Sequence, residues 1–335
     1  MKNHRKTTVL IAILAAAQLP IQAKAEEDAA FRKIVENAGG KVEFDKDGNP
    51  VLLDLYNGNN PLKGRGGKNE QVNDSWLKHL EGRTTIKDLN LANCAVTDAG
   101  MKSVGTLTGL ENLNLTLTPV TDAGFVHFEK LTKLRTLGLA SSQCSGTGFK
   151  HLPVKELENV NFHYTPLDDK GLEAICNVGV TGRFWFAHTH FTDVGTTQLS
   201  KLTKLKVLGI GSSEKGSTGQ ALAPMVKLPL EDLSILDKQA DPIGITYAAQ
   251  IKSLKKLDIS YAPLLTDNEI ALLAAMPNLE TLSIGGSNKI TDQGIAKLAG
   301  SKSLKHLTLQ RLKLVTKDAA ANLEKSNPGL LVTLK

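Results

Sequence analysis

The chain has 335 residues, of which 41% are hydrophobic, 4% aromatic and 22% charged. Lysine and arginine number 40 against 34 aspartate and glutamate residues, but four of these cations precede Glu26. Without that N-terminal segment the balance is 36 to 34, so composition gives no electrostatic case for nucleic-acid binding.

The N-terminal segment up to Ala25 has the three parts of a secretory signal peptide. A basic start over residues 1–6 precedes an apolar run from Val9 to Ala17, and Ala-Lys-Ala ending at Ala25 has the form of a cleavage site. The apolar run is short for a bilayer span. We predict a signal peptide over residues 1–25 and export to the periplasm, cell surface or medium after cleavage. An uncleaved N-terminal anchor is the alternative.

Residues 26–50 are predicted to form a helix followed by a hairpin. Phe31, Ile34 and Val35 share one face of the helix, a Gly-Gly pair ends it, and Asp-Lys-Asp-Gly separates two strand-like segments. We expect this unit to cap the N-terminal end of the segment that follows.

A Gly- and Asn-rich insertion occupies residues 57–71. It carries Lys63, Arg65 and Lys68. We interpret it as a solvated loop; an arm that contacts an anionic partner is the alternative.

The segment 51–325 repeats one pattern with a period of about 24 residues. Its first part is L-x-x-L-x-L, as in Leu110, Leu113 and Leu115, where the last two apolar positions alternate as in a strand. Its second part has a glycine followed by apolar residues at helical spacing. The positions equivalent to this glycine are Gly100, Gly124, Gly148, Gly171, Gly195, Gly219, Gly244, Glu269, Gly294 and Ala319. Each repeat therefore consists of a short strand, a loop and a short helix.

The segment from Ile86 to Gly100 reads IKDLNLANCAVTDAG. It resembles the cysteine-containing subtype of the leucine-rich-repeat family, whose pattern is L-x-x-L-x-L-x-x-C-x-x-[IV]-T-D-x-G. Together with the signal-peptide pattern, the chain resembles a bacterial-type exported member of this family. Other coils hold Thr or Ser at the position of Cys94. The resemblance implies an α/β fold, a right-handed curved solenoid with a parallel sheet on its concave face and short helices on its convex face. We expect about ten repeats after an atypical first coil, and a C-terminal cap over residues 326–335.

The residue three positions before each reference residue is of a type that starts helices. These residues are Thr97, Thr121, Ser145, Asp168, Thr192, Gly216, Asp241, Thr266, Thr291 and Thr316. We predict that they are structural caps, each worth about 1 kcal/mol. The aspartate that often follows suits the positive end of the helix dipole. Ten copies of one motif do not make the unique constellation that catalysis needs.

The candidate binding site lies on the concave face, where side chains between the leucines point outward. The site residues that we predict are Trp185, Arg183, His163, Asn161, Asn159, Arg135 and Asn114. Tryptophan and arginine together are typical of binding hot spots. The alternative is that Trp185 packs over the irregular fifth coil. His163, His188 and His190 could also meet at a metal, but no carboxylate or fourth ligand is in register.

Cys94 and Cys144 are two coils apart, about 10 Å at the usual strand spacing, which is beyond the reach of a disulfide. We therefore expect free thiols.

Neither G-x-S-x-G nor H-E-x-x-H occurs, and no cofactor is predicted. Solenoids similar to this one are mostly interaction surfaces. We therefore expect a non-enzymatic extracytoplasmic protein that binds a protein partner through the concave sheet. The alternative is recognition of cell-wall or surface carbohydrate, with Trp185 stacked on a sugar ring and the asparagine column bonding its hydroxyls.

Overall fold

The computed structural model describes residues 24, 26–56 and 67–335. The predicted signal peptide, apart from residue 24, lies outside the described residues, as does most of the insertion with Lys63 and Arg65. Among the described residues, no helix is both long and apolar enough to cross a membrane.

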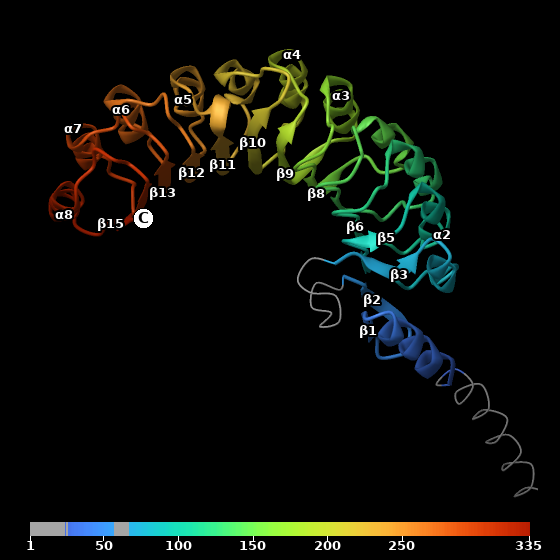
Figure 1. The fold of residues 1–335 in the computed structure, drawn as a ribbon. Coiled ribbons are helices and arrows are strands. Elements are labelled where there is room, and N and C mark those ends of the chain that lie inside the picture. Colours follow the sequence, from blue (N-terminus) through green and yellow to red (C-terminus); the bar gives the residue numbers. More distant parts are fainter. Residues whose placement is uncertain (1–23, 25, 57–66) are drawn as a thin grey trace, which may run out of the picture.

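The described chain forms a curved solenoid with strands along its inner margin and short helices along its outer margin (Figure 1). This confirms the predicted leucine-rich-repeat architecture. The strands are β1 (Lys41–Phe44), β2 (Pro50–Asp54), β3 (Asn69–Asn73), β4 (Asp88–Asn90), β5 (Cys94–Ala95), β6 (Asn112–Asn114), β7 (Thr136–Gly138), β8 (Leu157–Asn161), β9 (Val180–Thr189), β10 (Val207–Ser213), β11 (Asp232–Leu236), β12 (Lys256–Ser260), β13 (Thr281–Gly285), β14 (His306–Gln310) and β15 (Leu331–Leu334).

The convex side is built from α-helices and short 3-10 helices. They are η1 (Trp76–Leu80), η2 (Asp98–Gly100), α2 (Met101–Val104), η3 (Asp122–Phe128), η4 (Thr147–His151), α3 (Asp169–Val178), α4 (Asp193–Thr196), η5 (Thr197–Lys201), η6 (Gly219–Met225), η7 (Asp237–Gln239), α5 (Pro242–Ala248), α6 (Asp267–Ala274), α7 (Asp292–Ala296), η8 (Lys297–Gly300) and α8 (Lys317–Ser326). A further helix over residues 26–37 precedes β1.

Thirteen of the strands form one sheet in the order β1-β2-β4-β6-β7-β8-β9-β10-β11-β12-β13-β14-β15. Its pairs are parallel except the N-terminal hairpin, where β1 runs antiparallel to β2. At the other end β15 pairs in parallel with β14. Residues 331–334, within the predicted C-terminal cap, therefore extend the sheet by one strand.

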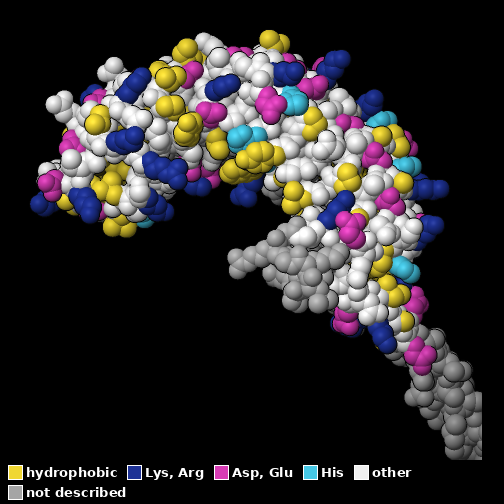
Figure 2. Space-filling view, in the orientation of Figure 1, with side chains coloured by type: hydrophobic (Ala, Val, Ile, Leu, Met, Phe, Trp, Pro, Cys, Tyr) yellow, Lys and Arg dark blue, Asp and Glu magenta, His cyan; other side chains and the backbone are white. Residues whose placement is uncertain are grey.

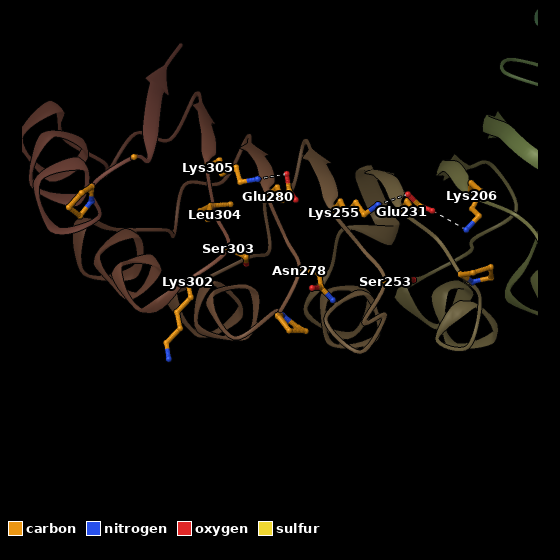
Figure 3. A pocket seen from close by; sticks show the side chains of 14 residues that line it. Lys206, Glu231, Ser253, Lys255, Asn278, Glu280, Lys302, Ser303, Leu304 and Lys305 are labelled. Atoms are coloured by element: carbon orange, nitrogen blue, oxygen red, sulfur yellow. Dashed lines mark hydrogen bonds and ion pairs between the residues drawn. The ribbon is translucent and has the colours of Figure 1, made fainter.

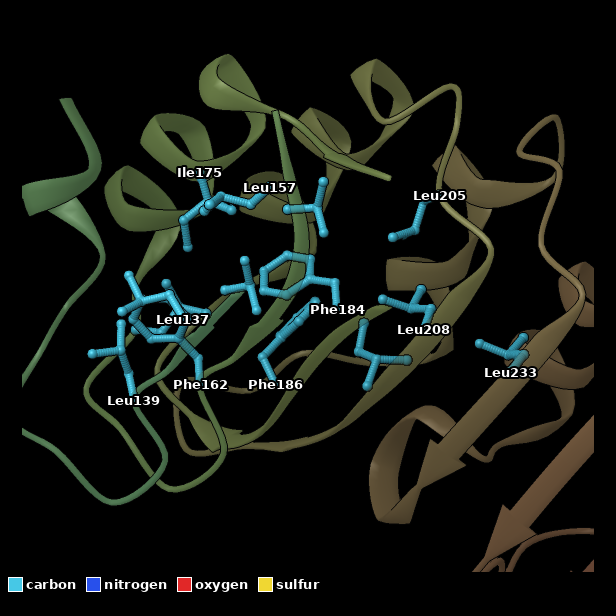
Figure 4. Close-up of a cluster of buried hydrophobic side chains, with 14 of the residues drawn as sticks. Leu137, Leu139, Leu157, Phe162, Ile175, Phe184, Phe186, Leu205, Leu208 and Leu233 are labelled. Carbon is cyan, nitrogen blue, oxygen red and sulfur yellow. The ribbon is translucent and has the colours of Figure 1, made fainter. Parts of the chain in front are cut away.

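The leucines of every coil point into one continuous core. Figure 4 shows Leu137, Phe162, Phe184 and Leu208 from successive coils side by side in the interior, and each is fully buried. The three cysteines are free and buried. Burial raises the pKa of each thiol to about 12, so these groups stay protonated at neutral pH and behave as small apolar side chains.

Hydroxyl and carboxylate side chains cap the helices at most of the expected positions. The Thr97 hydroxyl accepts a hydrogen bond from the Ala99 N–H at 3.3 Å, and the Asp168 carboxylate accepts one from the Gly171 N–H at 2.9 Å. Equivalent bonds are accepted by Thr121, Thr192, Asp241, Thr266, Thr291 and Thr316.

The caps differ from the expectation in two coils. Gly146, in the left-handed conformation, takes the cap position that we assigned to Ser145, because the helical turn of this coil begins one residue later in the repeat, at Thr147. In the sixth coil Thr218 is the cap and Gly216 is not, because the chain from Thr192 to the start of the next helix is longer than in the neighbouring coils.

Each first-turn aspartate joins its own coil to the next one. The Asp98 carboxylate accepts hydrogen bonds from the Thr121 backbone N–H at 2.8 Å and from the Thr121 hydroxyl at 2.7 Å. The same pair of bonds recurs at Asp74–Thr97, Asp122–Ser145, Asp169–Thr192, Asp193–Thr218, Asp267–Thr291 and Asp292–Thr316. We call this arrangement the carboxylate bridge.

Three coils that are followed by another repeat helix lack the aspartate at this position, where the residues are Gly146, Gly219 and Pro242; in the tenth coil Lys317 takes the same position. At each of these junctions the following coil supplies its own carboxylate. Asp168 and Asp241 serve as acidic caps, and Asp241 also accepts a hydrogen bond from the Gly219 N–H at 3.1 Å. After Pro242, Glu269 accepts bonds from the N–H and the hydroxyl of Thr266, at 2.8 and 2.9 Å.

The reference glycines leave room for the bridging carboxylate. A Cβ atom at Gly195 would lie 2.0 Å from Asp169 Oδ1, and one at Gly294 would lie 2.0 Å from Asp267 Oδ1. Glu269 takes the glycine position in the one coil that follows Pro242, where no preceding carboxylate fills that space.

We predict that Asp98→Ala lowers the free energy of unfolding by about 2 kcal/mol, because it leaves the N–H of Thr121 without a partner. Asp318→Ala is the matched control, since Asp318 also lies in a first helical turn but no repeat helix follows it in the described residues. Urea unfolding of both variants measures the difference. Equal losses would assign the effect to the helix dipole and contradict the bridge.

Candidate functional site

The strand register places most of the predicted binding residues in two neighbouring rows across the concave sheet. One row runs Asn114, Gly138, Asn161, Trp185 and Gly209 on β6 to β10. The second row runs through Thr136, Asn159, Arg183 and Val207. These rows follow because every coil adds one strand and the outward positions alternate along it.

A groove of about 470 Å³ covers the first part of these rows, over β2, β4, β6, β7 and β8. Among its lining residues are Asn114 and Asn161 of the predicted site, together with Asp54, Asp88, Asn90, Asn112 and Thr136. Gly138 lies between the two asparagines in the row. The Asn114 side chain lies over this glycine, since a Cβ atom there would be 2.8 Å from Asn114 Oδ1.

Asn114 and Asn161 are held in place through their side-chain oxygens. The side-chain oxygens of Asn114 and Asn161 accept hydrogen bonds from the backbone N–H groups of Thr116 and His163, each at 3.0 Å. Neither amide nitrogen has an acceptor among the described residues. Two donors at fixed positions therefore face the groove, and acceptor groups of a ligand can pair with them.

Acceptors lie at the N-terminal end of the same groove. Asp54 accepts a hydrogen bond from the Asn90 amide at 2.8 Å, and Asp88 accepts one from the Asn112 amide. Sequence reasoning missed Asp54, Asp88, Asn112 and Thr136 as site residues. The signal was available, since each occupies one of the same outward rows as Asn114, Asn159 or Asn161.

Trp185 lies beside this groove, and its indole packs on the neighbouring strand. A Cβ atom at Gly209 would be 2.5 Å from Cε3 of Trp185, so the ring covers that glycine. The indole Nε1 is buried and has no hydrogen-bond partner among the described residues. This packing matches the alternative interpretation of Trp185. Arg183, in contrast, is exposed and forms no ion pair with another described residue.

Two predicted residues lie away from the groove. Arg135 is at the edge where the strands begin and forms an ion pair with Glu158, which raises the pKa of its guanidinium. His163 lies just beyond the end of β8. Its ring is 4.7 Å from that of Tyr164 and 5.5 Å from that of His188. Partial burial and the neighbouring His188 lower the pKa of His163, which is therefore neutral at pH 7.

A row of left-handed residues forms the corner beyond the strand ends. Their φ angles lie between 45° and 59°, which is uncommon for residues with a side chain, and they are Asn93, Leu117, Ser141, Tyr164, His188, Ser212, Asp237, Tyr261 and Arg311. Tyr164 and His188 are neighbours in this row and their rings stack, with centroids 4.3 Å apart. Tyr164 is 57% exposed. Figure 2 shows hydrophobic and histidine side chains together near the middle of the inner margin.

Within the described residues, no three His, Cys, Asp or Glu side chains come together in a way that could hold a metal ion. The concave face therefore offers amide donors, carboxylate and hydroxyl acceptors, one exposed guanidinium and an aromatic pair. This set is suited to hydrogen bonding with a ligand.

Comparison with known proteins agrees with this fold. A family model described as Leucine Rich repeat matches residues 83–105 and 275–299. The internalin inlF of Listeria monocytogenes superposes with a TM-score of 0.53 at 14% identity, over 92% of this chain and 94% of that one. A comparison with curated proteins finds no match.

Two further solved structures are less similar. The Rad7 and Elc1 complex of yeast gives a TM-score of 0.47 at 14% identity over 98% of this chain and 85% of that one. A leucine-rich-repeat protein of Leptospira interrogans gives 0.47 at 17% identity over 77% of this chain and 62% of that one. Of these three structures, the internalin alone bears on the fold. The cysteine-containing subtype stays a prediction.

We predict that Gly209→Ala displaces the Trp185 indole, because the new methyl group would overlap the ring. In a Trp76→Phe background Trp185 is the sole tryptophan. Acrylamide should quench its fluorescence more strongly when Gly209→Ala is added. Gly285→Ala in the same background is the control, since its Cβ would meet its nearest neighbour at 3.4 Å. Unchanged quenching in Gly209→Ala would show that the indole does not pack there.

Proposed function

We propose that this leucine-rich-repeat protein binds a protein partner through the concave face, with the groove over β2 to β8 as the centre of the contact. The observation that carries the proposal is the pair of amide donors on Asn114 and Asn161, which lie on either side of Gly138 in one row and have no acceptor in the described chain. An extended or looped polypeptide supplies backbone carbonyls as acceptors and N–H groups as donors for Asp54 and Asp88.

Arg183 extends this surface beyond the groove. It lies in the row next to Asn161 and Trp185, is exposed, and is free to pair with a carboxylate of a partner. Arginine contributes strongly at interfaces because its guanidinium donates several hydrogen bonds and also packs on apolar groups. The stacked Tyr164–His188 pair, at the end of the same strands, adds an aromatic contact at the rim.

We also propose that the protein acts outside the cytoplasm as a binding protein and not as an enzyme. The signal-peptide pattern of residues 1–25 supports export, and mass spectrometry of the native protein should find Glu26 as its first residue. A native N-terminus upstream of residue 26 would contradict cleavage at this site.

Carbohydrate recognition is the second candidate. The amides, carboxylates and threonine hydroxyls of the groove are the groups that bind sugar hydroxyls. The packing of Trp185 on Gly209 weakens its assigned role as a stacking platform, and the exposed Tyr164 ring is better placed for it. Binding on a glycan array that is abolished by Asn114→Ala/Asn161→Ala would favour this candidate.

The test uses residues 26–335 as bait for affinity capture from an extract of the producing cells, with retained proteins quantified by mass spectrometry. We expect Asn114→Ala/Asn161→Ala/Arg183→Ala to weaken retention of a specific protein at least about 10-fold, as expected for the loss of several interface hydrogen bonds. Asn268→Ala/Asn322→Ala is the matched control, because both side chains are exposed on convex helices. Equal retention by all three baits would exclude the groove.

A further inference from the structure

A second groove, of about 720 Å³, lies on the flank where the strands of the last coils begin. Figure 3 shows one wall formed by Lys206, Glu231, Lys255, Glu280 and Lys305 from five successive coils. The opposite wall comes from the loops before the strands and includes Lys302. Pro229, Pro277 and Pro328 add apolar surface.

The charges on the first wall alternate in sign along the coils. Glu231 lies between two lysines, 2.9 Å from Lys206 and 2.8 Å from Lys255, and Glu280 is 2.9 Å from Lys305. Hydrogen bonds from Lys255 and Lys206 lower the pKa of Glu231 to about 2. Three lysines against two glutamates leave this wall with one positive charge in excess.

Additional cations at the groove have no partner in the described chain. Lys302 in the wall and Lys252, whose backbone oxygen accepts a hydrogen bond from Asn278 in the groove, are exposed and form no ion pair with another described residue. Residues 201–335 as a whole contain 18 Lys and Arg against 12 Asp and Glu, whereas residues 26–200 contain 18 against 22. In Figure 2, dark-blue side chains gather over this C-terminal part of the solenoid.

We propose that this flank groove docks an extended acidic segment of a partner protein. Its wall lysines recur at every second coil, a separation of about 10 Å at the usual strand spacing. Carboxylates three residues apart in an extended chain are also about 10 Å apart. The intervening glutamates would repel a uniformly anionic polymer, and the three prolines offer apolar contact to the residues between the carboxylates.

This surface is separate from the concave face, since no residue lines both grooves. Loss of concave-face binding would therefore leave this inference intact, and the reverse also holds.

A matched pair of charge-reversal variants distinguishes binding in the flank groove from general electrostatic attraction to the protein. Lys252→Glu/Lys302→Glu changes unpaired cations at the groove, and Lys130→Glu/Lys133→Glu changes exposed lysines in an earlier coil.

The probe is a fluorescein-labelled peptide of four Glu-Gly-Ser repeats, with four Gln-Gly-Ser repeats as the neutral control. Fluorescence anisotropy with residues 26–335 should show binding of the acidic peptide that is at least about 10-fold weaker in Lys252→Glu/Lys302→Glu and changed less than about 2-fold in Lys130→Glu/Lys133→Glu. Thermal unfolding checks that both variants are folded.

The inference is overturned if the acidic peptide does not bind, or if both double variants weaken it equally. It is also overturned if heparin binds more tightly than the peptide and loses more affinity in Lys252→Glu/Lys302→Glu, because the groove would then serve a polyanion. Light scattering that detects a dimer lost only in that variant, without peptide binding, would assign the groove to a second copy of the chain.

Discussion

The solenoid depends on one carboxylate at every junction between coils. A helix begins with backbone N–H groups that have no partner within the helix, and in a stack of short helices these groups recur once in each coil. In the carboxylate bridge the neighbouring coil supplies the missing acceptor. One aspartate accepts hydrogen bonds from both the backbone N–H and the hydroxyl of the next cap residue. The three junctions without the aspartate have an acidic residue in the following coil instead, so the requirement is for a carboxylate at that place and not for one residue type.

The bridge on the convex side and the sheet on the concave side hold the same register. Each coil is displaced from its neighbour by one strand, and outward side chains of equivalent positions therefore line up in rows. Charged side chains form a further row where the strands begin, and their signs alternate from coil to coil. The ion pairs Lys87–Glu111 and Lys206–Glu231 belong to this row. Two glycines within these rows determine how the neighbouring side chains lie. Gly138 leaves room for the Asn114 side chain, and Gly209 leaves room for the Trp185 indole.

The repeat could be predicted from the sequence because it is encoded locally. Strand alternation, the cap residues and the glycine positions all lie within one coil, and their regular recurrence aligns the coils without any knowledge of contacts. The error at Gly216 arose where one coil is longer than the others. The outward rows were also predictable, which is why Asn159, Asn161, Arg183 and Trp185 were placed together.

What could not be predicted involves contacts between coils. Asp98 was assigned to the dipole of its own helix, because its hydrogen-bond partner Thr121 belongs to the next coil. The packing of Trp185 depends on Gly209 in the next strand, and the position of the Asn114 side chain depends on Gly138 in the next strand. The ion pair between Arg135 and Glu158 is also a contact between coils, since Glu158 holds the equivalent position one coil later.

The most direct test of the carboxylate requirement is a double-mutant cycle at the junction between Pro242 and Glu269. Glu269→Gly removes the local carboxylate from Thr266, and Pro242→Asp introduces the bridging aspartate for which the new glycine leaves room. We expect that each single change destabilises the protein or leaves it no more stable, and that the double variant recovers stability. The coupling free energy from urea unfolding should then be about 2 kcal/mol. Additive effects, within about 0.5 kcal/mol, would contradict the claim that the start of each repeat helix requires one carboxylate.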